Sequence, residues 1–147
     1  MNKEKDIYIR RTIETDMEEL RSIYLEVRKN EFNWVDNTFA TLLDFDSCTN
    51  GETIFTAVVN NKIAGFISIW EPDKFIHNLF VAKDFRNMGL GKALLNAAVK
   101  KCGVPLTLKC VKDNTKSVDF YLANGWSIEK EEDDGCGTYY LMIYATE

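Results

Sequence analysis

A glycine-containing segment over residues 86–92, Arg-Asn-Met-Gly-Leu-Gly-Lys, has the composition of a site for a phosphate-bearing ligand. It joins an apolar run that ends near Ala82 to a run with helical spacing, so it is expected to lie where a strand leads into a helix. The first turn of a helix has unpaired N–H groups and the positive end of the helix dipole, and both attract an anion. Gly89 and Gly91 would let a phosphate approach the backbone, while Arg86 and Lys92 would add positive charge.

Two common nucleotide-binding loops do not match this segment. A P-loop needs glycine at position 86 and serine or threonine at position 93, where the chain has Arg86 and Ala93. A dinucleotide fingerprint needs a third glycine shortly after Gly91, and none is present. Two interpretations stay open: a diphosphate site of another kind, and a glycine turn that only closes the loop before the helix.

The segment resembles the GNAT superfamily of N-acyltransferases, whose hallmark R-x-x-G-x-G, or G-x-A in its last three positions, is matched by Arg86, Gly89 and Gly91. The preceding Leu-Phe-Val at 79–81 looks like the L-x-V ending of the fourth strand of that family. Downstream, residues 114–126 resemble the family's N-x-x-a-x-x-F-Y-x-x-x-G-F element, with Trp126 in place of the usual phenylalanine. The motif-specific resemblance covers about residues 75–126, and the order of elements extends it over 7–144.

The resemblance implies acetyl-CoA as co-substrate and no metal. In the family the loop amides hold the pyrophosphate of acyl-CoA, and the backbone of the preceding strand pairs with the pantetheine arm. Asn114 is expected to cap the next helix and to contact the same arm, and Ser117 to add a hydrogen bond. The expected cofactor-binding residues are Leu79, Phe80, Val81, Arg86, Asn87, Met88, Gly89, Leu90, Gly91, Lys92, Asn114, Ser117 and Tyr121.

The implied reaction is acetyl transfer to a primary amine by direct attack on the thioester. Tyr121 is at the position where the family places the proton donor to the departing thiolate, and such assistance is typically worth about 10²- to 10⁴-fold in rate. The structural alternative is a core tyrosine whose hydroxyl is already hydrogen-bonded. A non-catalytic acyl-CoA-binding or protein-interaction domain of the same fold is the alternative function.

The attacking amine must lose a proton, which for a lysine-like amine costs about 4–5 kcal/mol at pH 7. His77, the only histidine, lies two residues before Leu79 and is the first candidate base. Glu71, in the turn after the strand that ends at Trp70, is its substitute. A structural histidine and a solvated turn carboxylate are the alternatives. None of the cysteines at 48, 102, 110 and 136 has a triad-like sequence context, which disfavours a covalent acyl-enzyme.

The acceptor site is expected between the first two helices, where the family builds much of it. Phe32, Trp34 and Asp36 lie there, and Trp70 ends the strand beside the expected cleft. An acidic side chain would suit a cationic amine of a small molecule or a protein. A solvated loop with one anchoring tryptophan is the alternative.

The elements that must position these residues alternate between strands and helices. The pattern predicts the order βααβββαβαββ and an α/β fold with a mixed sheet covered by helices on both faces. The resemblance implies that this sheet is GNAT-like. A capping box of Thr15 and Glu18 predicts a helix that begins near Asp16. The other predicted elements are a strand at 7–10, a loop and short helix within 32–45, a hairpin of 54–59 and 62–70 around Asn60-Asn61, a strand at 75–82, a helix from 90, a strand at 106–111, a helix at 117–124 and a strand pair at 126–130 and 139–144.

Composition limits the function classes. A chain of 147 residues with 46% hydrophobic content is expected to form one domain over 1–147. A net charge of −5 argues against a nucleic-acid partner, and no apolar window is long enough for a membrane span. The charged N-terminal residues and the scattered cysteines predict a cytoplasmic protein with reduced thiols and no zinc site. The resemblance makes a homodimer through the last strands plausible.

Overall fold

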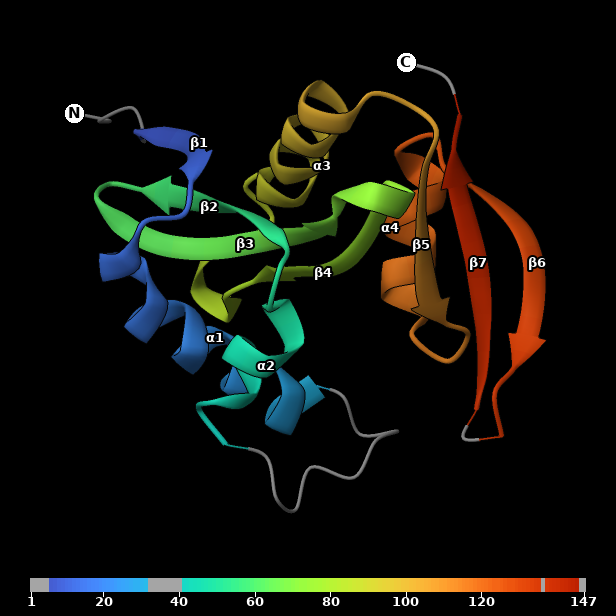
Figure 1. Ribbon diagram of the computed structural model, residues 1–147, viewed down its shortest axis with the longest axis horizontal. Coiled ribbons are helices and arrows are strands. Elements are labelled where there is room, and N and C mark those ends of the chain that lie inside the picture. Colours follow the sequence, from blue (N-terminus) through green and yellow to red (C-terminus); the bar gives the residue numbers. More distant parts are fainter. Residues whose placement is uncertain (1–5, 32–40, 136, 146–147) are drawn as a thin grey trace.

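The computed structural model describes residues 6–31, 41–135 and 137–145, and it confirms the predicted order of elements (Figure 1). The strands and helices are β1 Ile7–Arg11, α1 Met17–Glu31, α2 Asp44–Thr49, β2 Thr53–Val59, β3 Lys62–Trp70, β4 Phe75–Val81, α3 Leu90–Cys102, β5 Leu106–Val111, α4 Thr115–Ala123, β6 Ser127–Asp133 and β7 Thr138–Tyr144. Short 3₁₀ helices lie at Glu14–Asp16, Glu71–Asp73 and Lys83–Phe85.

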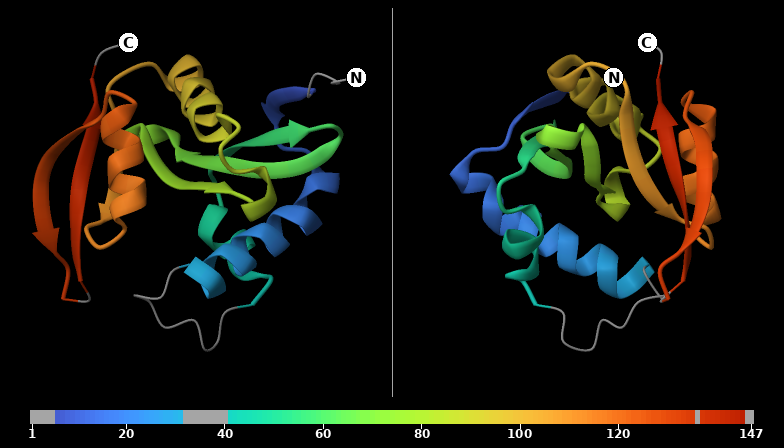
Figure 2. Two further views of the ribbon diagram at one scale, coloured as in Figure 1. Left: turned by 180° about the vertical axis from the view of Figure 1, so that it is seen from behind. Right: turned by 45° about the vertical axis from the view of Figure 1, so that its right-hand side comes forward.

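The strands form a seven-stranded mixed sheet in the order β1-β2-β3-β4-β5-β7-β6, as the predicted fold class requires. Every neighbouring pair is antiparallel except β4 and β5, which are parallel. These two strands pair only at Phe75 with Thr107 and at Ile76 with Leu108. Figures 1 and 2 show β5, β7 and β6 turned at a large angle to β2, β3 and β4. The sheet therefore splits between β4 and β5 beyond Ile76.

A β-bulge lies at the point where the split begins. Ser68 of β3 pairs with Asn78 and Ile69 pairs with Ile76, so His77 is the extra residue on β4. A bulge bends its strand and increases the local twist, and bulges are common beside functional sites. His77 is also the first residue of β4 that has no partner on β5.

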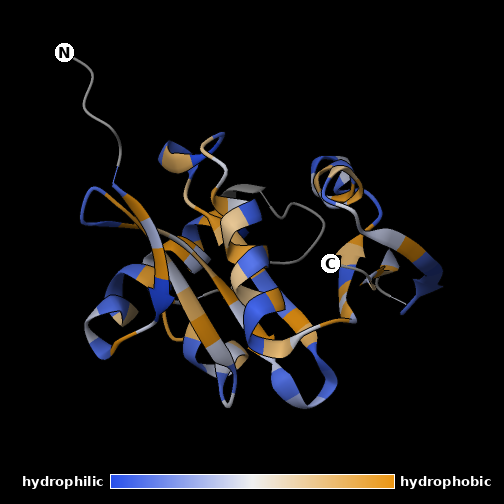
Figure 3. Ribbon diagram, turned by 90° about the horizontal axis from the view of Figure 1, so that it is seen from above, coloured by the Kyte–Doolittle hydropathy of each residue, from blue (hydrophilic) through white to orange (hydrophobic). Residues whose placement is uncertain are grey.

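Helices cover the two faces of the sheet. In Figure 1, α3 lies above the strands and α1 and α2 lie below them. The α3 side holds a cluster of buried apolar residues that includes Leu94 and Ile76, and the other side holds an aromatic cluster in which Tyr24 of α1 stacks on Phe80, 5.2 Å between centroids. Figure 3 shows hydrophobic residues concentrated along the central strands between these helices. Within the residues described, no helix has the length and apolar character needed to cross a bilayer.

Of the short sequence signals, the one for a tight turn was confirmed and the one for a helix cap was not. Asn60 and Asn61 have φ of +50° and +67°, which confirms the predicted hairpin between β2 and β3. The predicted capping box of Thr15 and Glu18 was wrong: the Asp16 carboxylate instead accepts a hydrogen bond from the Ile13 amide at 2.9 Å, and α1 begins after a 3₁₀ turn. The second helix lies later than predicted, at Asp44–Thr49.

Candidate functional site

A cavity of about 600 Å³ lies where the sheet splits. Its walls come from the end of β4, the loop after it, the first turn of α3 and the inner face of α4, with Val27 of α1 on one side. The volume is in the range of about 300–1,000 Å³ that is typical of small-molecule sites. The predicted cofactor-binding residues that line it are Leu79, Phe80, Val81, Arg86, Asn87, Gly89, Leu90, Gly91, Lys92, Asn114, Ser117 and Tyr121.

The first turn of α3 opens into this cavity. Its N-cap is Gly89, with φ of +80° and no side chain capping the helix, so the amides of the first turn keep their donors for a ligand. Gly91 faces the Phe120 ring of α4, and a Cβ at this position would lie only 2.8 Å from Phe120 Cζ. The Arg86 guanidinium donates to the Val81 carbonyl at 3.2 Å from both Nε and an Nη atom, which ties the loop back to β4.

Positive charge lines the same cavity. Arg86 and Lys92 were predicted there, and the structure adds Lys116 from the first turn of α4. These three cations and the positive end of the α3 dipole favour an anion at this entrance. The arrangement therefore fits a diphosphate, and the alternative of a turn that only closes the loop does not explain the open cavity.

Tyr121 lies at the inner wall of the cavity. It is 9% exposed, and its ring packs between Phe120 and Trp126, at 5.3 and 5.7 Å between centroids. Burial raises the pKa of the Tyr121 hydroxyl, with a smaller contribution from Cys110, so the group stays protonated at neutral pH. Among the described residues no partner accepts or donates to this hydroxyl, although the side chain lines the cavity. The predicted alternative, a core tyrosine with a satisfied hydroxyl, does not fit this environment.

Asn114 caps α4, as the sequence predicts. Its side-chain oxygen accepts a hydrogen bond from the Ser117 amide at 3.3 Å, and both residues line the cavity. Met88 differs from its neighbours in the loop, because it packs against the core on the α3 side and does not line the cavity.

The structure also shows lining residues that the sequence reasoning missed. Val27, Phe85, Lys116 and Phe120 contribute to the cavity without having been assigned a role. Lys116 and Phe120 lie within the motif at 114–126, and Phe120 is three residues after Ser117 and four after Lys116, so helical spacing from Ser117 was an available signal for Phe120. Val27 carried no such signal, because its position depends on how α1 packs across the sheet.

His77 lies at the bulge, beside the cavity and not in its lining, with two ionisable neighbours from other elements. Its Nδ1 is 2.8 Å from an oxygen of Glu52, and the Cys48 sulfur of α2 is 3.7 Å from Nε2 and 3.8 Å from Nδ1. The hydrogen bond with Cys48 raises the pKa of His77 to about 9 against the opposing effect of burial, and Glu52 adds to the increase. The expectation that no cysteine has a triad-like context was wrong, because Cys48 acquires that context only in three dimensions.

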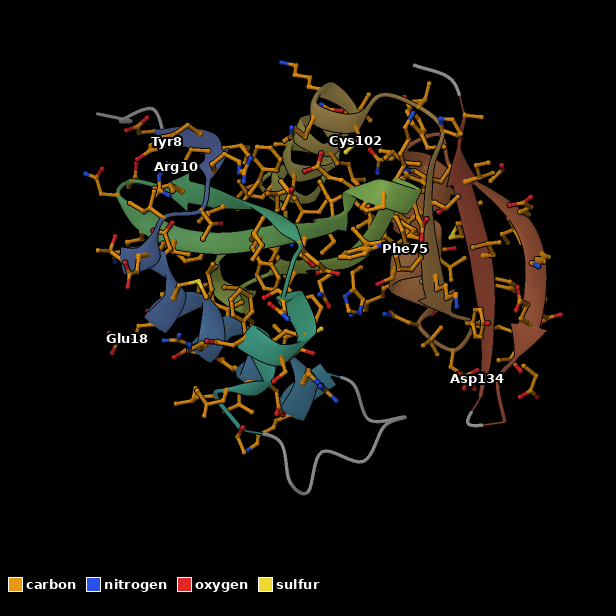
Figure 4. The ribbon with its side chains drawn as sticks, in the orientation of Figure 1. Tyr8, Arg10, Glu18, Phe75, Cys102 and Asp134 are labelled. Carbon is orange, nitrogen blue, oxygen red and sulfur yellow. The ribbon has the colours of Figure 1, made fainter. Side chains whose placement is uncertain are left out.

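Glu71, the second candidate base, does not reach the cavity. It hydrogen-bonds to Thr53 and lies 3.5 Å from the Lys101 ammonium. Lys101 and Cys102, which is labelled in Figure 4, lie at the end of α3 that is distant from the glycine loop. The bond from Thr53 lowers the pKa of Glu71, so this carboxylate is a weak proton acceptor. Trp70, 40% exposed, contacts the turn at Gly51 and is not part of the lining either. The acceptor candidates Phe32, Trp34 and Asp36 lie outside the described residues.

Comparison with known proteins places this geometry in a family. Residues 13–126 match the model of the acetyltransferase (GNAT) family. No curated protein matches the sequence. Solved structures match over almost the entire chain but at low identity, which by itself shows a shared fold.

Three of these structures illustrate the similarity. Apo YjaB from Escherichia coli has 20% identity and a TM-score of 0.75, covering 97% of this chain and 99% of its own. A ribosomal-protein-alanine N-acetyltransferase from Brucella melitensis has 18% identity and a TM-score of 0.73, with coverage of 95% and 99%. YncA from Salmonella typhimurium, a putative acetyltransferase solved with its cofactor acetyl-CoA, has 16% identity and a TM-score of 0.72, with coverage of 97% and 95%.

Proposed function

Because the chain belongs to the acetyltransferase (GNAT) family, we propose that it transfers an acetyl group from acetyl-CoA to a primary amine. The observation that carries this proposal is the cavity at the split of the sheet, which joins an uncapped helix N-terminus at one end to a buried, protonated Tyr121 at the other. The acceptor is an amine of a small molecule or of a protein.

In this proposal the amides of α3's first turn hold the pyrophosphate, with Arg86, Lys92 and Lys116 balancing its charge. The pantetheine arm lies along β4, whose edge towards β5 is unpaired beyond Ile76, and Leu79 and Val81 offer main-chain groups to it. Asn114 and Ser117 contact the arm from α4. A main-chain N–H of β4 polarises the thioester carbonyl, which is oxyanion stabilisation by a preorganised donor.

The amine attacks the carbonyl carbon directly, the carbon–sulfur bond breaks, and Tyr121 donates its proton to the departing thiolate. His77 lies at the bulge of β4, beside the lining of the cavity, and accepts the proton from the amine through Nε2 and an intervening water, since Nδ1 is bonded to Glu52. Because the pKa of His77 is about 9, only a small fraction is able to accept a proton at pH 7. Turnover should therefore rise with pH towards about 9, and the rise should be less steep in His77→Gln, in which only the amine itself titrates.

The test combines Tyr121→Phe with an assay of thiol release from acetyl-CoA over a panel of amines. The variant should bind coenzyme A as the wild type does while its turnover falls by about 10²- to 10⁴-fold, because only the proton donor is lost. If Tyr121→Phe turned over as fast as the wild type, Tyr121 would not be the proton donor. Binding of coenzyme A without thiol release for any amine would favour the alternative of a non-catalytic binding domain.

A further inference from the structure

Three reactive side chains from separate elements meet at the bulge of β4: Cys48 of α2, Glu52 from the segment before β2, and His77. We call them the Cys48 cluster. Cys48 and Glu52 are 29 and 25 residues from His77 in the sequence. The cluster lies beside the cavity rather than in its lining, on the side of the sheet covered by α1 and α2.

Glu52 is the anionic base of the cluster. Its side chain is 7% exposed and one oxygen, Oε2, contacts His77 Nδ1 at 2.8 Å. The other oxygen, Oε1, is buried and has no hydrogen-bond partner among the described residues. A buried carboxylate with one unsatisfied oxygen is costly unless a cation lies beside it. The cluster therefore favours a protonated, positively charged His77.

That positive charge faces the Cys48 sulfur. The sulfur is almost equidistant from the two ring nitrogens, at 3.7 and 3.8 Å, and an imidazolium shares its charge between both. Asn78 also donates its side-chain N–H to the sulfur at 3.4 Å, and Asn78 is held in place by Ser68 at 2.8 Å. These contacts stabilise a sulfur anion.

The other groups that face Cys48 act in the same direction. Burial opposes ionisation of Cys48, but its hydrogen bonds with His77 and Asn78 and the nearby Tyr24 hydroxyl of α1 outweigh it, and the pKa of the thiol is lowered. Arg28 donates to the Tyr24 hydroxyl at 3.1 Å and supports this arrangement from the next turn of α1. Cys102 differs, because burial and the nearby Glu71 raise its pKa.

We propose that Cys48 is a nucleophilic thiolate, paired with the imidazolium of His77, that is modified by small electrophiles and in particular is oxidised by hydroperoxides. The sulfur attacks the terminal oxygen of the peroxide, a sulfur–oxygen bond forms and the oxygen–oxygen bond breaks. The alkoxide or hydroxide leaves and takes a proton from water. Cys48 becomes a sulfenic acid and the hydroperoxide is reduced to an alcohol or to water.

Oxidation of Cys48 would also affect residues that line the cavity. Cys48 accepts a hydrogen bond from Asn78, the residue before Leu79, and packs against the aromatic cluster in which Tyr24 stacks on Phe80. Leu79 and Phe80 both line the cavity. If the proposed acetyl transfer is correct, an added oxygen on Cys48 lowers the activity; this consequence rests on the proposed function, whereas the reactivity of Cys48 does not.

The experiment measures the labelling rates of individual cysteines by peptide mass spectrometry. The wild-type protein is treated with iodoacetamide between pH 5 and 9, and separately with hydrogen peroxide followed by dimedone. Cys102 is the internal reference because, like Cys48, it is only partly exposed. An ordinary thiol is about 3% ionised at pH 7, so labelling of Cys48 should be at least about tenfold faster than that of Cys102.

Variants identify the source of this reactivity. His77→Gln should reduce the labelling of Cys48 at pH 7 to near that of Cys102, and Glu52→Gln should reduce it in part. Glu129→Gln, on the exposed face of β6, should change nothing. Labelling of wild-type Cys48 no faster than Cys102 would overturn the proposal, and this result needs no folded variant. Fast labelling that persists in a folded His77→Gln protein would overturn the role of His77. Neither readout depends on acetyl transfer, so the two proposals fail separately.

Discussion

The contact between Gly91 and Phe120 makes a substitution at position 91 a direct test of the cavity. A Cβ on Gly91 would lie 2.8 Å from Cζ and 3.2 Å from Cε1 of Phe120. Since carbon atoms are best separated by about 3.5–4.0 Å, the ring must move by roughly 1 Å in Gly91→Ala. Phe120 lines the cavity and its ring lies edge-on to Tyr121. Movement of the Phe120 ring should therefore change the shape of the cavity where the ligand is proposed to bind.

The expected loss of stability is small because two effects oppose one another. Alanine is favoured over glycine inside a helix by up to about 1 kcal/mol, whereas overpacking typically costs about 1–3 kcal/mol. The net loss should be about 1 kcal/mol, which lowers the Tm of a protein of this size by about 2–4 °C. The affinity for coenzyme A should fall more, by about tenfold or 1.4 kcal/mol, because the displaced ring narrows the site.

Thermal unfolding with and without coenzyme A, together with calorimetric titration, measures both quantities. Gly103→Ala is the matched control: Gly103 has φ of +74° at the opposite end of α3, and an added Cβ meets no atom within 4 Å. Backbone strain should make that variant less stable without changing its affinity for coenzyme A. Wild-type affinity in Gly91→Ala, or an equal loss of affinity in Gly103→Ala, would refute the reasoning.

Three further substitutions test how the fold supports the site. Asp16 is 3% exposed and accepts from Arg10 at 2.6 and 2.9 Å; Asp16→Asn should lower the unfolding free energy by about 2–3 kcal/mol in urea at pH 7. The Arg10 bond lowers the pKa of Asp16 against burial, so this stabilisation is complete above about pH 4 and is lost as the pH falls further; an unchanged difference at pH 3 would contradict it. Asn114→Ala should remove the α4 cap and lower the free energy of unfolding by about 1 kcal/mol. An unchanged free energy of unfolding would mean that the Ser117 amide had found another acceptor. Gly65→Ala places a Cβ 2.4 Å from the Phe80 carbonyl oxygen and should lower the Tm by more than about 4 °C, because two strands must separate.

Features that depend on residues close together in the sequence could be predicted from it. Asn60-Asn61 specified the hairpin, because two consecutive positive φ angles suit few residue types. The glycine loop predicted the entrance of the cavity, and Asn114 predicted the cap of α4, because both signals act within one turn of helix. Glu71 was predicted from its position after a strand, yet its carboxylate is bonded to Thr53 and Lys101, which the sequence did not indicate.

By itself, then, the sequence determined the order of the elements, the glycine loop before α3 and the family pattern around Tyr121, since each is a pattern of closely spaced residues. Only the tertiary structure decided that the sheet splits after Ile76, that Phe120 packs on Gly91, and that Cys48 and Glu52 meet His77. The periodicity of a strand or helix says which face is apolar, but it does not say which residue of another element lies opposite. Those contacts depend on strand register and on how the helices pack across both faces of the sheet.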